Sequence, residues 1–451
     1  MRMTVIGTGY LGAVHAAAMA ELGHDVLGVD SDPGKIAALA AGRAPFFEPG
    51  LPELLIRNVR AGRLSFSTSL EDAAAFADIH FVCVGTPQLP GSHAADMVHV
   101  NAVVAGLAPH LTRPCLIVGK STVPVGTTAR LADLVAELAP VGVQAQVAWN
   151  PEFLREGFAV EDTLRPDRIV AGTNSHEADA ILREVYADIL AAGTPYITTD
   201  AATAELVKVS ANAFLATKIS FINAIAQVCD AAGADVLTLA DALGHDARIG
   251  RRFLSPGLGF GGGCLGKDIR AFQARAGELG VGEALAFLDD VDAINTNGRS
   301  RIVTLAGELL GGSAQGKRIA VLGAAFKPNS DDVRDSPALH VAEQLRLAGA
   351  TVRVHDPEAL ANARRAYPHL EYAPELSTVF EDADLTLHLT EWGMYRDLDP
   401  RTVHASARTP QIIDARHTLD PKSWQDAGWT VRALGRPMLG GSEVANLAVA
   451  L

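Results

Sequence analysis

The feature that most constrains the fold is a glycine-rich turn near the N-terminus of the chain. Residues 3–6 predict a short apolar strand, which is followed by Gly7-Thr8-Gly9-Tyr10-Leu11-Gly12 and an alanine-rich helix. A second predicted strand, residues 25–30, ends in Asp30. A G-x-G-x-x-G turn binds a dinucleotide when it lies between a strand and a helix and an acidic residue follows about 20 residues further on. This chain has all of these features.

Each residue type in this turn has a physical reason. Gly7 permits the tight turn, Gly9 lets a pyrophosphate approach backbone amides, and Gly12 allows the helix to pack closely on the strand. Asp30 can accept hydrogen bonds from ribose hydroxyls and would repel a 2′-phosphate. No arginine follows it, so the turn favours NAD over NADP. From these residues alone, a glycine turn that binds no ligand remains the alternative.

Apolar stretches alternate with helical patterns through the first part of the chain. Buried parallel strands are predicted at residues 79–84, 115–118 and 143–149. This alternation is typical of a doubly wound sheet with helices on both faces. We therefore predict an NAD-binding Rossmann-like domain over residues 1–200.

The C-terminal part, residues 301–451, repeats this texture and predicts a second Rossmann-like domain. Its strands are predicted at residues 316–323, 350–357, 384–389 and 411–414. Its first turn, Gly323-Ala324-Ala325-Phe326-Lys327-Pro328, lacks the three glycines. We expect this domain to bind something other than a dinucleotide. The residues after about 436 suggest no role.

Residues 201–300 predict a central helical region. Segment 201–232 has helical spacing of apolar residues without an internal glycine or proline, which predicts one long spine helix and a natural dimer surface. Lys208 and Lys218 within it argue against a membrane span. The predicted fold class is therefore α/β, with two Rossmann-like doubly wound domains joined by a helical central region with a long spine helix.

Net charge and cysteine content limit the partners and the cellular location that the sequence predicts. The net charge of −14 disfavours nucleic acid or an anionic membrane as partner. Four cysteines without paired spacing, and no export signal, predict reduced thiols and a cytoplasmic protein. No His/Cys/Asp cluster has metal-ligand spacing, so we predict no metal. Only eight of the 38 basic residues are lysine, so a retained lysine, such as Lys120, suggests a need for a compact cation.

Polar residues follow several predicted strands, where ligands bind in such sheets. Thr86 and Thr122 lie in two of these strand-end loops, and Glu152 and Glu156 lie in a third. If the third segment is helical, the two carboxylates share one face. Taken singly, each loop is as readily explained by a plain connection or a solvated face.

The spine helix carries Lys208 and Asn212 four residues apart among apolar positions. A buried Lys–Asn pair on one face suits the stabilisation of a developing oxyanion. A lysine whose ammonium reaches past an apolar face to solvent is the competing interpretation.

The sharpest motif is the glycine-rich loop from Gly257 to Asp268, which contains Cys264. Its glycines leave backbone amides and space accessible to a substrate. Lys267 and a helix start favour the thiolate of Cys264, and Asp268 can act as a base. The other cysteines, Cys83, Cys115 and Cys229, lie in apolar patterns typical of a core. Two interpretations remain open: Cys264 traps an aldehyde during a four-electron oxidation, or it is structural in a two-electron hydroxy-acid dehydrogenase.

Seven motifs occur in one order along residues 1 to about 420. They are the glycine fingerprint, VGTP, KSTVP, NPEFLREG, KxxxNAFLATKISFINAIA, GFGGGCLGKD and AFKPNSDDVRDSP. In this order they resemble the UDP-glucose/GDP-mannose dehydrogenase family. The early Glu48-Pro49-Gly50-Leu51 and the stretch Ala216–Ser220 are most similar to its UDP-glucose branch.

The resemblance implies NAD-dependent oxidation of UDP-glucose to UDP-glucuronate through a thiohemiacetal and a thioester on Cys264. The implied catalytic residues are Cys264, Asp268, Lys208, Asn212, Glu152 and Thr122. The implied NAD-binding residues are Gly7, Gly9, Gly12, Asp30, Lys35, Thr86, Thr122, Glu156, Lys267 and Arg334. The implied sugar-nucleotide residues are Glu152, Phe153, Leu154, Lys208, Asn212, Arg248, Phe253, Leu254, Ser255, Pro256, Gly257, Gly261, Lys327 and Arg416. Arg248 resembles an arginine offered to a neighbouring subunit, which implies a homodimer.

Two departures from the family pattern concern specificity and rate. Phe253 stands where the family usually has tyrosine, so one hydroxyl contact to substrate is missing. Gly266 stands where the family usually has proline, which loosens the turn before Lys267 and Asp268. A dehydrogenase for GDP-mannose or a UDP-N-acetylhexosamine, and a non-catalytic NAD- or nucleotide-sugar-binding regulator, remain alternatives.

Overall fold

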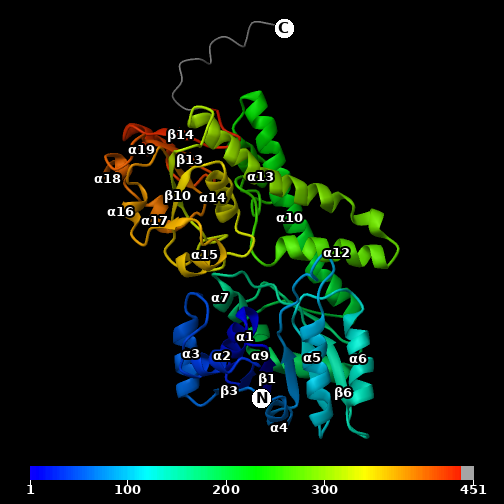
Figure 1. The fold of residues 1–451 in the computed structure, drawn as a ribbon. Helices are drawn as coiled ribbons and strands as arrows, with labels where there is room; N and C mark the ends of the chain where they lie inside the picture. Colours follow the sequence, from blue (N-terminus) through cyan, green and yellow to red (C-terminus); the bar gives the residue numbers. More distant parts are fainter. Residues whose placement is uncertain (438–451) are drawn as a thin grey trace. The chain divides into compact units, whose positions relative to one another are not determined.

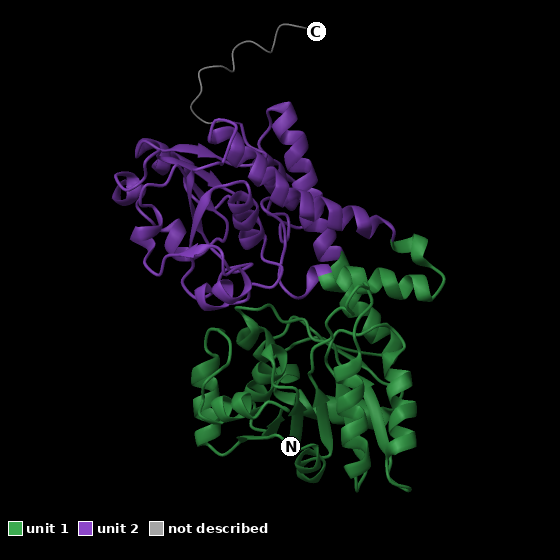
Figure 2. Ribbon diagram, in the orientation of Figure 1, with its two compact units in different colours: residues 1–213, 267–285 green, residues 214–266, 286–451 purple. Residues whose placement is uncertain are grey.

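The computed structural model describes residues 1–437, so the sequence after about 436 falls almost entirely outside the described residues. The described chain forms two compact units (Figure 2). Unit 1 comprises residues 1–213 and 267–285, and unit 2 comprises residues 214–266 and 286–437 of the described chain. The division into an NAD-binding domain, a central domain and a C-terminal domain at residues 200 and 300 stays a prediction.

Unit 1 is built on an eight-stranded sheet in the order β3-β2-β1-β4-β5-β6-β7-β8 (Figure 1). Its first six strands have the 3-2-1-4-5-6 order of dinucleotide-binding folds. Neighbouring strands are parallel except where β6 meets β7 at Trp149 and Gly172. The strands are β1 (Arg2–Ile6), β2 (Asp25–Val29), β3 (Leu64–Ser67), β4 (Ile79–Val82), β5 (Cys115–Gly119), β6 (Ala145–Trp149), β7 (Ile169–Gly172) and β8 (Tyr196–Thr199).

Apolar residues cover both faces of this sheet, as a parallel sheet between helices requires. Met3 and Val5 of β1 belong to one hydrophobic core, whereas Ile6 belongs to the core on the other face. The helices are α1 (Tyr10–Glu21), α2 (Pro33–Ala40), α3 (Leu51–Arg60), α4 (Leu70–Phe76), α5 (Val98–Leu107), α6 (Thr127–Leu138), α7 (Ala159–Leu164), α8 (His176–Val185) and α9 (Ala187–Ala191), with short 3-10 turns at Ala108–His110 and Gly282–Leu285.

Unit 2 contains a six-stranded parallel sheet in the order β11-β10-β9-β12-β13-β14. This is again the 3-2-1-4-5-6 order, so the predicted fold class is confirmed in both halves of the chain. The strands are β9 (Arg318–Leu322), β10 (Thr351–His355), β11 (Glu371–Tyr372), β12 (Leu385–His388), β13 (Gln411–Asp414) and β14 (Thr430–Arg432).

Helices surround this second sheet and extend from it. They are α11 (Val236–Gly244), α13 (Phe287–Leu309), α14 (Pro337–Leu347), α15 (Leu360–Ala366), α16 (Leu376–Val379), α17 (Gly393–Arg396), α18 (Pro400–His404) and α19 (Pro421–Asp426). Two further helices contribute residues to both units, namely α10 (Ala201–Ala232) and α12 (Leu265–Glu278).

The predicted spine helix over residues 201–232 is confirmed as α10. By length and apolar composition alone, this helix would also qualify as a membrane span. Its polar residues are engaged inside the protein instead. The buried Glu205 carboxylate accepts hydrogen bonds from the amides of Gly126 and Thr128, and the buried Ser220 hydroxyl donates to Val291. We therefore assign α10 as the core helix of a soluble protein.

Candidate active site

The first βα turn has the geometry that a phosphate cradle needs. Gly7 has φ of +91°, and a Cβ on it would lie 2.6 Å from the Val84 side chain. A Cβ on Gly12 would lie 1.8 Å from the Gly7 carbonyl oxygen, so helix α1 can begin this close to β1 only with glycine there. Nothing lies within 4 Å of a Cβ on Gly9, which is the N-cap of α1. The turn therefore leaves the amides at the start of the helix accessible to an anion.

Asp30, directly after β2, is held in place as an acceptor. Its carboxylate accepts hydrogen bonds from the Thr8 amide at 2.9 Å, the Lys35 ammonium at 2.8 Å and the Asp32 amide at 3.1 Å. Burial would raise the pKa of Asp30, but Lys35 and these two amides hold it below its ordinary value. An ionised carboxylate at this place fits the hydroxyls of a ribose and disfavours a 2′-phosphate.

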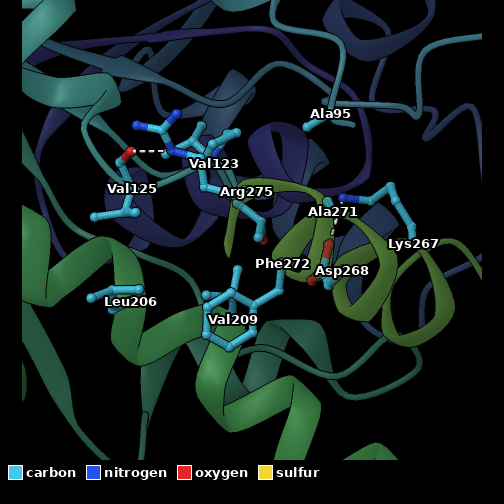
Figure 3. A pocket seen from close by; sticks show the side chains of 12 residues that line it. Ala95, Val123, Val125, Leu206, Val209, Lys267, Asp268, Ala271, Phe272 and Arg275 are labelled. Carbon is cyan, nitrogen blue, oxygen red and sulfur yellow. Dashed lines mark hydrogen bonds and ion pairs between the residues drawn. The ribbon is translucent and has the colours of Figure 1, made fainter. Parts of the chain in front are cut away.

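The strand-end loops after β4 and β5 are joined to each other. The Thr86 hydroxyl donates to the Thr122 carbonyl oxygen at 2.7 Å. Thr122 itself lines a small cavity of about 20 Å³, room for about one water molecule. The same cavity is lined by Val209 from α10 and by Lys267, Asp268 and Phe272 from α12 (Figure 3).

Asp268 is the centre of a buried polar cluster beside this cavity. One of its oxygens accepts from the Asn212 side-chain amide at 2.6 Å, and the other accepts from the Lys267 ammonium at 2.6 Å. Asp268 and Asn212 are both buried. The ammonium of Lys208, one turn before Asn212, lies 5.5 Å from the centre of the Phe153 ring. Unit 1 therefore brings together the two predicted spine residues, Asp268 and the strand-end loops.

The segment from Asn150 to Gly157 is not helical, so the condition under which Glu152 and Glu156 would share a helix face is not met. The segment is an irregular loop between β6 and α7, and side chains accept hydrogen bonds from several of its backbone amides. Glu152 accepts from the amides of Phe153 and Leu154 at 2.7 and 3.0 Å. Carboxylates thus bind amides that a helix would have bonded to backbone carbonyl oxygens.

Glu48 is a functional neighbour of this loop that the sequence indicated only as a marker of the family branch. Its buried carboxylate accepts from the amides of Gly157 and Ala159, both at 2.7 Å, and from the Tyr10 hydroxyl. Burial and the contact with Glu48 raise the pKa of Tyr10 well above its ordinary range. Tyr10 lies within the Gly7–Gly12 turn. Its contact with Glu48 therefore connects that turn to the loop that contains Glu156 and Gly157.

In unit 2, the glycines of the predicted cysteine loop allow close packing. A Cβ on Gly261 would lie 2.3 Å from the Asp335 carbonyl oxygen, and one on Gly262 would lie 2.7 Å from the Phe326 ring. A Cβ on Gly263 would lie 2.7 Å from the Arg334 guanidinium. The glycines thus let residues of the segment after β9 approach the loop, a use that the sequence did not indicate. Cys264 is exposed and directly precedes α12.

The remaining substrate candidates of unit 2 lie around the same loop. Arg416 donates to the carbonyl oxygens of Gly259 and Leu389 at 3.1 and 2.7 Å. Lys327 lies in the turn after β9 with its ammonium 5.4 Å from the centre of the Phe326 ring. Gly257 donates its amide to Asn223 on α10 at 2.8 Å. Four further candidates precede Gly257 in the chain, namely Phe253, Leu254, Ser255 and Pro256, and Phe253 has φ of +65°.

Arg248 lies apart from these residues on the surface of unit 2. Its guanidinium is paired with Asp246 and largely exposed, as expected of a side chain offered outward. Lys218 on α10 donates to the carbonyl oxygens of Ile249 and Gly250 and so anchors the segment that carries Arg248.

The four cysteines divide as predicted between the core and the surface. Cys83, Cys115 and Cys229 are buried, and burial raises the pKa of Cys83 to about 12 and that of Cys115 to about 11. Cys264 is the exposed one. Within residues 1–437, no three His, Cys, Asp or Glu side chains gather in a way that could hold a metal ion.

Three family models match successive parts of the chain. Residues 1–190 match the NAD binding domain of the UDP-glucose/GDP-mannose dehydrogenase family, residues 202–297 its central domain, and residues 320–421 its UDP binding domain. The chain is 40% identical to the UDP-glucose 6-dehydrogenase of Rhizobium meliloti over 439 residues, which cover 97% of this chain and 100% of the relative. It is also 40% identical to UDP-glucose 6-dehydrogenase TuaD of Bacillus subtilis, covering 98% and 95% of the two chains.

Solved structures give the same picture over nearly the full length. A UDP-glucose dehydrogenase from the hyperthermophilic archaeon Pyrobaculum islandicum superposes with a TM-score of 0.88 at 39% identity, covering 96% of this chain and 97% of the other. A UDP-D-ManNAc dehydrogenase from Pyrococcus horikoshii superposes with a TM-score of 0.84 at 27% identity, covering 97% and 100%.

Proposed function

Because the chain belongs to the UDP-glucose/GDP-mannose dehydrogenase family, we propose that it oxidises C6 of UDP-glucose to the carboxylate of UDP-glucuronate. The observation that carries this proposal is the full-length similarity to UDP-glucose 6-dehydrogenases at about 40% identity. The chain is an oxidoreductase with NAD as cofactor and a nucleotide sugar as substrate.

The residues of the first βα turn fit NAD. Gly7, Gly9 and Gly12 would shape the cradle for the pyrophosphate, and Asp30, held by Lys35, would accept hydrogen bonds from the ribose. We assign Thr86, Thr122, Glu156, Lys267 and Arg334 to the same cofactor. Two NAD molecules, bound in turn, would supply the hydride acceptors for the two oxidations.

The first oxidation removes a hydride from C6 and a proton from its hydroxyl group. Lys208 and Asn212 would donate hydrogen bonds to the C6 oxygen as negative charge develops there. Asp268 already accepts a hydrogen bond from Asn212, so it orients that amide. Proton transfer by groups of this kind accelerates a reaction by roughly 10²–10⁴-fold.

The second oxidation uses an adduct because hydride loss directly from a trigonal aldehyde carbon would leave an acylium ion, whereas a nucleophile added to that carbon gives a tetrahedral adduct whose oxygen can expel the hydride. The Cys264 thiolate would add to the aldehyde carbon, and loss of a second hydride would leave a thioester. Water then forms the new C–O bond, the C–S bond breaks, and its electron pair returns to the sulfur of Cys264. The proton released by water would pass to a carboxylate, for which Glu152 and Asp268 are the candidates.

We assign the sugar nucleotide to Phe153, Leu154, Phe253–Gly257, Gly261, Lys327 and Arg416, in addition to Glu152, Lys208 and Asn212. Lys327 and Arg416 supply the positive charge that a diphosphate requires. Phe253 provides no hydroxyl group, and Gly266 gives the turn after Cys264 more freedom than proline would. These two positions are where sugar preference and rate are expected to differ from those of relatives.

The test counts NADH formed per limiting sugar nucleotide, with UDP-glucose, GDP-mannose and UDP-N-acetylglucosamine in parallel. The expected result is two NADH per UDP-glucose with little turnover of the other two. One NADH with a released aldehyde or ketone contradicts the four-electron reaction. No turnover of UDP-glucose, with turnover of another nucleotide, contradicts the substrate. NAD and UDP-glucose binding without any turnover would indicate a regulator.

A homodimer is also proposed, with α10 as its surface. Phe214, Phe221 and Val228 recur every seven residues on α10 and are exposed, so they form one apolar stripe. A second copy packed on this stripe would bury it, and the outward-pointing Arg248 would reach the partner's substrate. Light scattering should give twice the chain mass, and Phe221→Asp should give the monomer. A monomeric parent protein would contradict the dimer.

A cytoplasmic location is proposed from the reduced state of the cysteines. No disulfide joins the four cysteines, which all lie within residues 1–437, and the exposed Cys264 must remain reduced to act as a nucleophile. Fractionation of cells should place the chain with the cytosolic proteins, and recovery with exported proteins would contradict this.

A further inference from the structure

A buried ammonium lies at the carboxyl edge of the sheet in unit 1. Lys120 directly follows β5, and only 4% of its side chain is exposed. Its Nζ lies 3.0 Å from Asn150 Oδ1, 3.2 Å from Glu152 Oε2 and 3.4 Å from the Tyr186 hydroxyl, with the Asn150 carbonyl oxygen at 3.5 Å. An ammonium has three donors, and the three nearer oxygens can each accept from one of them.

The acceptors of this ammonium are themselves fixed. Asn150 directly follows β6, and its Oδ1 also accepts a hydrogen bond from the buried Tyr186 hydroxyl at 2.6 Å. Its Nδ2 donates to the Val170 carbonyl oxygen of β7 at 2.8 Å. The polar groups around Lys120 therefore connect β5, β6, β7 and the end of α8, and little freedom is left for the ammonium to move.

The surroundings of Lys120 favour its protonated form. Burial lowers the pKa of Lys120, but its neighbours, of which Glu152 forms the ion pair, leave that pKa above the ordinary value. Burial raises the pKa of Cys83 to about 12, so that thiol is neutral. Burial, and then the charge of Lys120, hold the pKa of His15 well below its ordinary value. Glu152 is thus the anion that faces the buried cation.

Glu152 is held from two sides. Its Oε1 accepts from the amides of Phe153 and Leu154, and its Oε2 faces Lys120. We propose that Lys120 is a positioning residue, whose buried ammonium fixes the carboxylate of Glu152 in the orientation needed to receive the proton of the attacking water. The inference rests on the role assigned above to Glu152.

The residue type supports this role. The chain contains only eight lysines among 38 basic residues, and one of them occupies this site. A guanidinium is larger and planar, with five donors in a fixed fork, so it cannot direct three donors at three oxygens grouped around one buried point. Arginine, the more frequent cation of this chain, would displace either Glu152 or Tyr186.

A double-mutant cycle on kcat separates positioning from general support of the fold. The variants are Lys120→Met, Glu152→Gln and the double variant, with Lys422→Met on the surface helix α19 as the matched control. Lys120→Met should lower kcat by about 10²-fold, since a misplacement near 1 Å has an effect of that size, with KM for UDP-glucose within about 3-fold. In the Glu152→Gln background the same change should lower kcat by less than about 3-fold. Lys422→Met should match the parent protein.

Intact-mass measurement during turnover adds a signature that a structural role would not move. Lys120→Met should accumulate the sugar-nucleotide thioester on Cys264, because water attack is the impaired step. Multiplicative losses of kcat in the double variant, or an unchanged kcat in Lys120→Met, overturn the proposal. If Lys120→Met does not yield folded protein, the same cycle is run with Lys120→Arg. An undiminished kcat in Lys120→Arg, or multiplicative losses of kcat in its double variant with Glu152→Gln, then overturns the proposal.

The cycle is also run on Tm without any substrate. The Tm losses of Lys120→Met and Glu152→Gln should not add in the double variant, because the two side chains share one interaction. Additive losses overturn the pairing, even if the parent protein does not oxidise UDP-glucose. A parent protein without UDP-glucose turnover contradicts the proposed function, whereas an active parent with a failed cycle contradicts only the role of Lys120.

Discussion

The two Rossmann-like sheets of the molecule share one strand order but differ in their first turn. In unit 1, α1 begins at Tyr10, only four residues after β1 ends at Ile6. In unit 2, β9 ends at Leu322 and α14 begins only at Pro337. Both turns open with a glycine of positive φ, Gly7 at +91° and Gly323 at +110°. The second turn therefore keeps the bend but has no helix start beside it.

The acid after the second strand of each sheet explains what each turn can bind. Asp30 accepts only one amide from its turn, that of Thr8. Asp356, directly after β10, accepts the amides of both Ala324 and Ala325, at 2.8 and 2.9 Å. The carboxylate of Asp356 thus engages two amides of the second turn, which are not available to an anion. The same topology leaves the amides of one turn accessible and bonds those of the other internally, depending on a few side chains.

The largest expected effect is on Asp356→Ala. Its buried carboxylate also accepts from the Trp392 indole and from the amides of Glu358 and Ala359. Each donor left unsatisfied costs about 1–3 kcal/mol, and relaxation with water entry recovers part, so the free energy of unfolding should fall by about 4 kcal/mol. Chemical denaturation measures this. Asp420→Ala, which removes the N-cap of α19, is the control and should cost about 1 kcal/mol. Equal losses would show that the second turn does not depend on its acid.

The next effect separates the glycines of the two turns. Gly12→Ala places a Cβ against the Gly7 carbonyl oxygen, and Gly323→Ala places one 2.3 Å from the Thr390 Cβ. Both should lower the free energy of unfolding by about 1–3 kcal/mol. Only Gly12→Ala should also weaken NAD binding, by about 10-fold or more, because the turn that would bind the pyrophosphate must widen.

Calorimetric titration with NAD measures this difference in affinity between the two variants. An equal loss of NAD affinity in Gly323→Ala would contradict the contrast between the turns.

Much of the fold could be predicted because periodicity and glycine placement are local signals. The strands at β1, β2, β4, β5 and β6, the four longer strands of the second sheet, and the spine helix α10 follow from apolar runs and the absence of breakers. The strands β3, β7 and β8 were not indicated. β3 and β8 are the edge strands of the sheet and are mixed in polarity, and β7 next to β8 has an apolar run of only four residues.

The contacts of the site could not be predicted, because they join residues far apart in the chain. Lys120 contacts Tyr186, and Glu48 contacts Gly157, and neither pair has a sequence spacing that marks it. The spacing of Glu152 and Glu156 left open whether the segment is helical, and side-chain acceptors stabilise a loop there. The buried glycines of the Cys264 loop appeared as space for a substrate, whereas the structure uses several of them for contact with the segment after β9.

The third prediction concerns the acid of the first turn alone. Asp30→Ser removes the carboxylate that we assign to the ribose and the repulsion of a 2′-phosphate. Hydrogen bonds to a charged group are worth about 1.5–3 kcal/mol, so kcat/KM with NAD should fall by roughly 10–10²-fold, and that with NADP should rise. Asp32→Ser is the control, because serine can still cap α2 and we assign this residue no contact with the cofactor. If Asp30→Ser does not change the preference for NAD over NADP, the ribose does not bind at the end of β2.

The smallest effect is a pH dependence of the same acid. The folded-state pKa of Asp30 lies below its ordinary value, because Lys35 and two amides outweigh burial. Its contribution to stability is therefore complete above the pKa of an unfolded aspartate, about 3.9, and is lost as the pH falls through the folded value. Lys35→Met removes the ammonium, so the free energy of unfolding should fall by about 0.5 kcal/mol at pH 7 and by less at pH 3, where protonation begins to remove the charge of Asp30. Urea denaturation at both pH values measures this. The Lys422→Met variant, whose pair is largely exposed, should show a smaller difference. A Lys35→Met loss of equal size at pH 3 and pH 7 would mean that Lys35 stabilises α2 by packing rather than through the charge of Asp30.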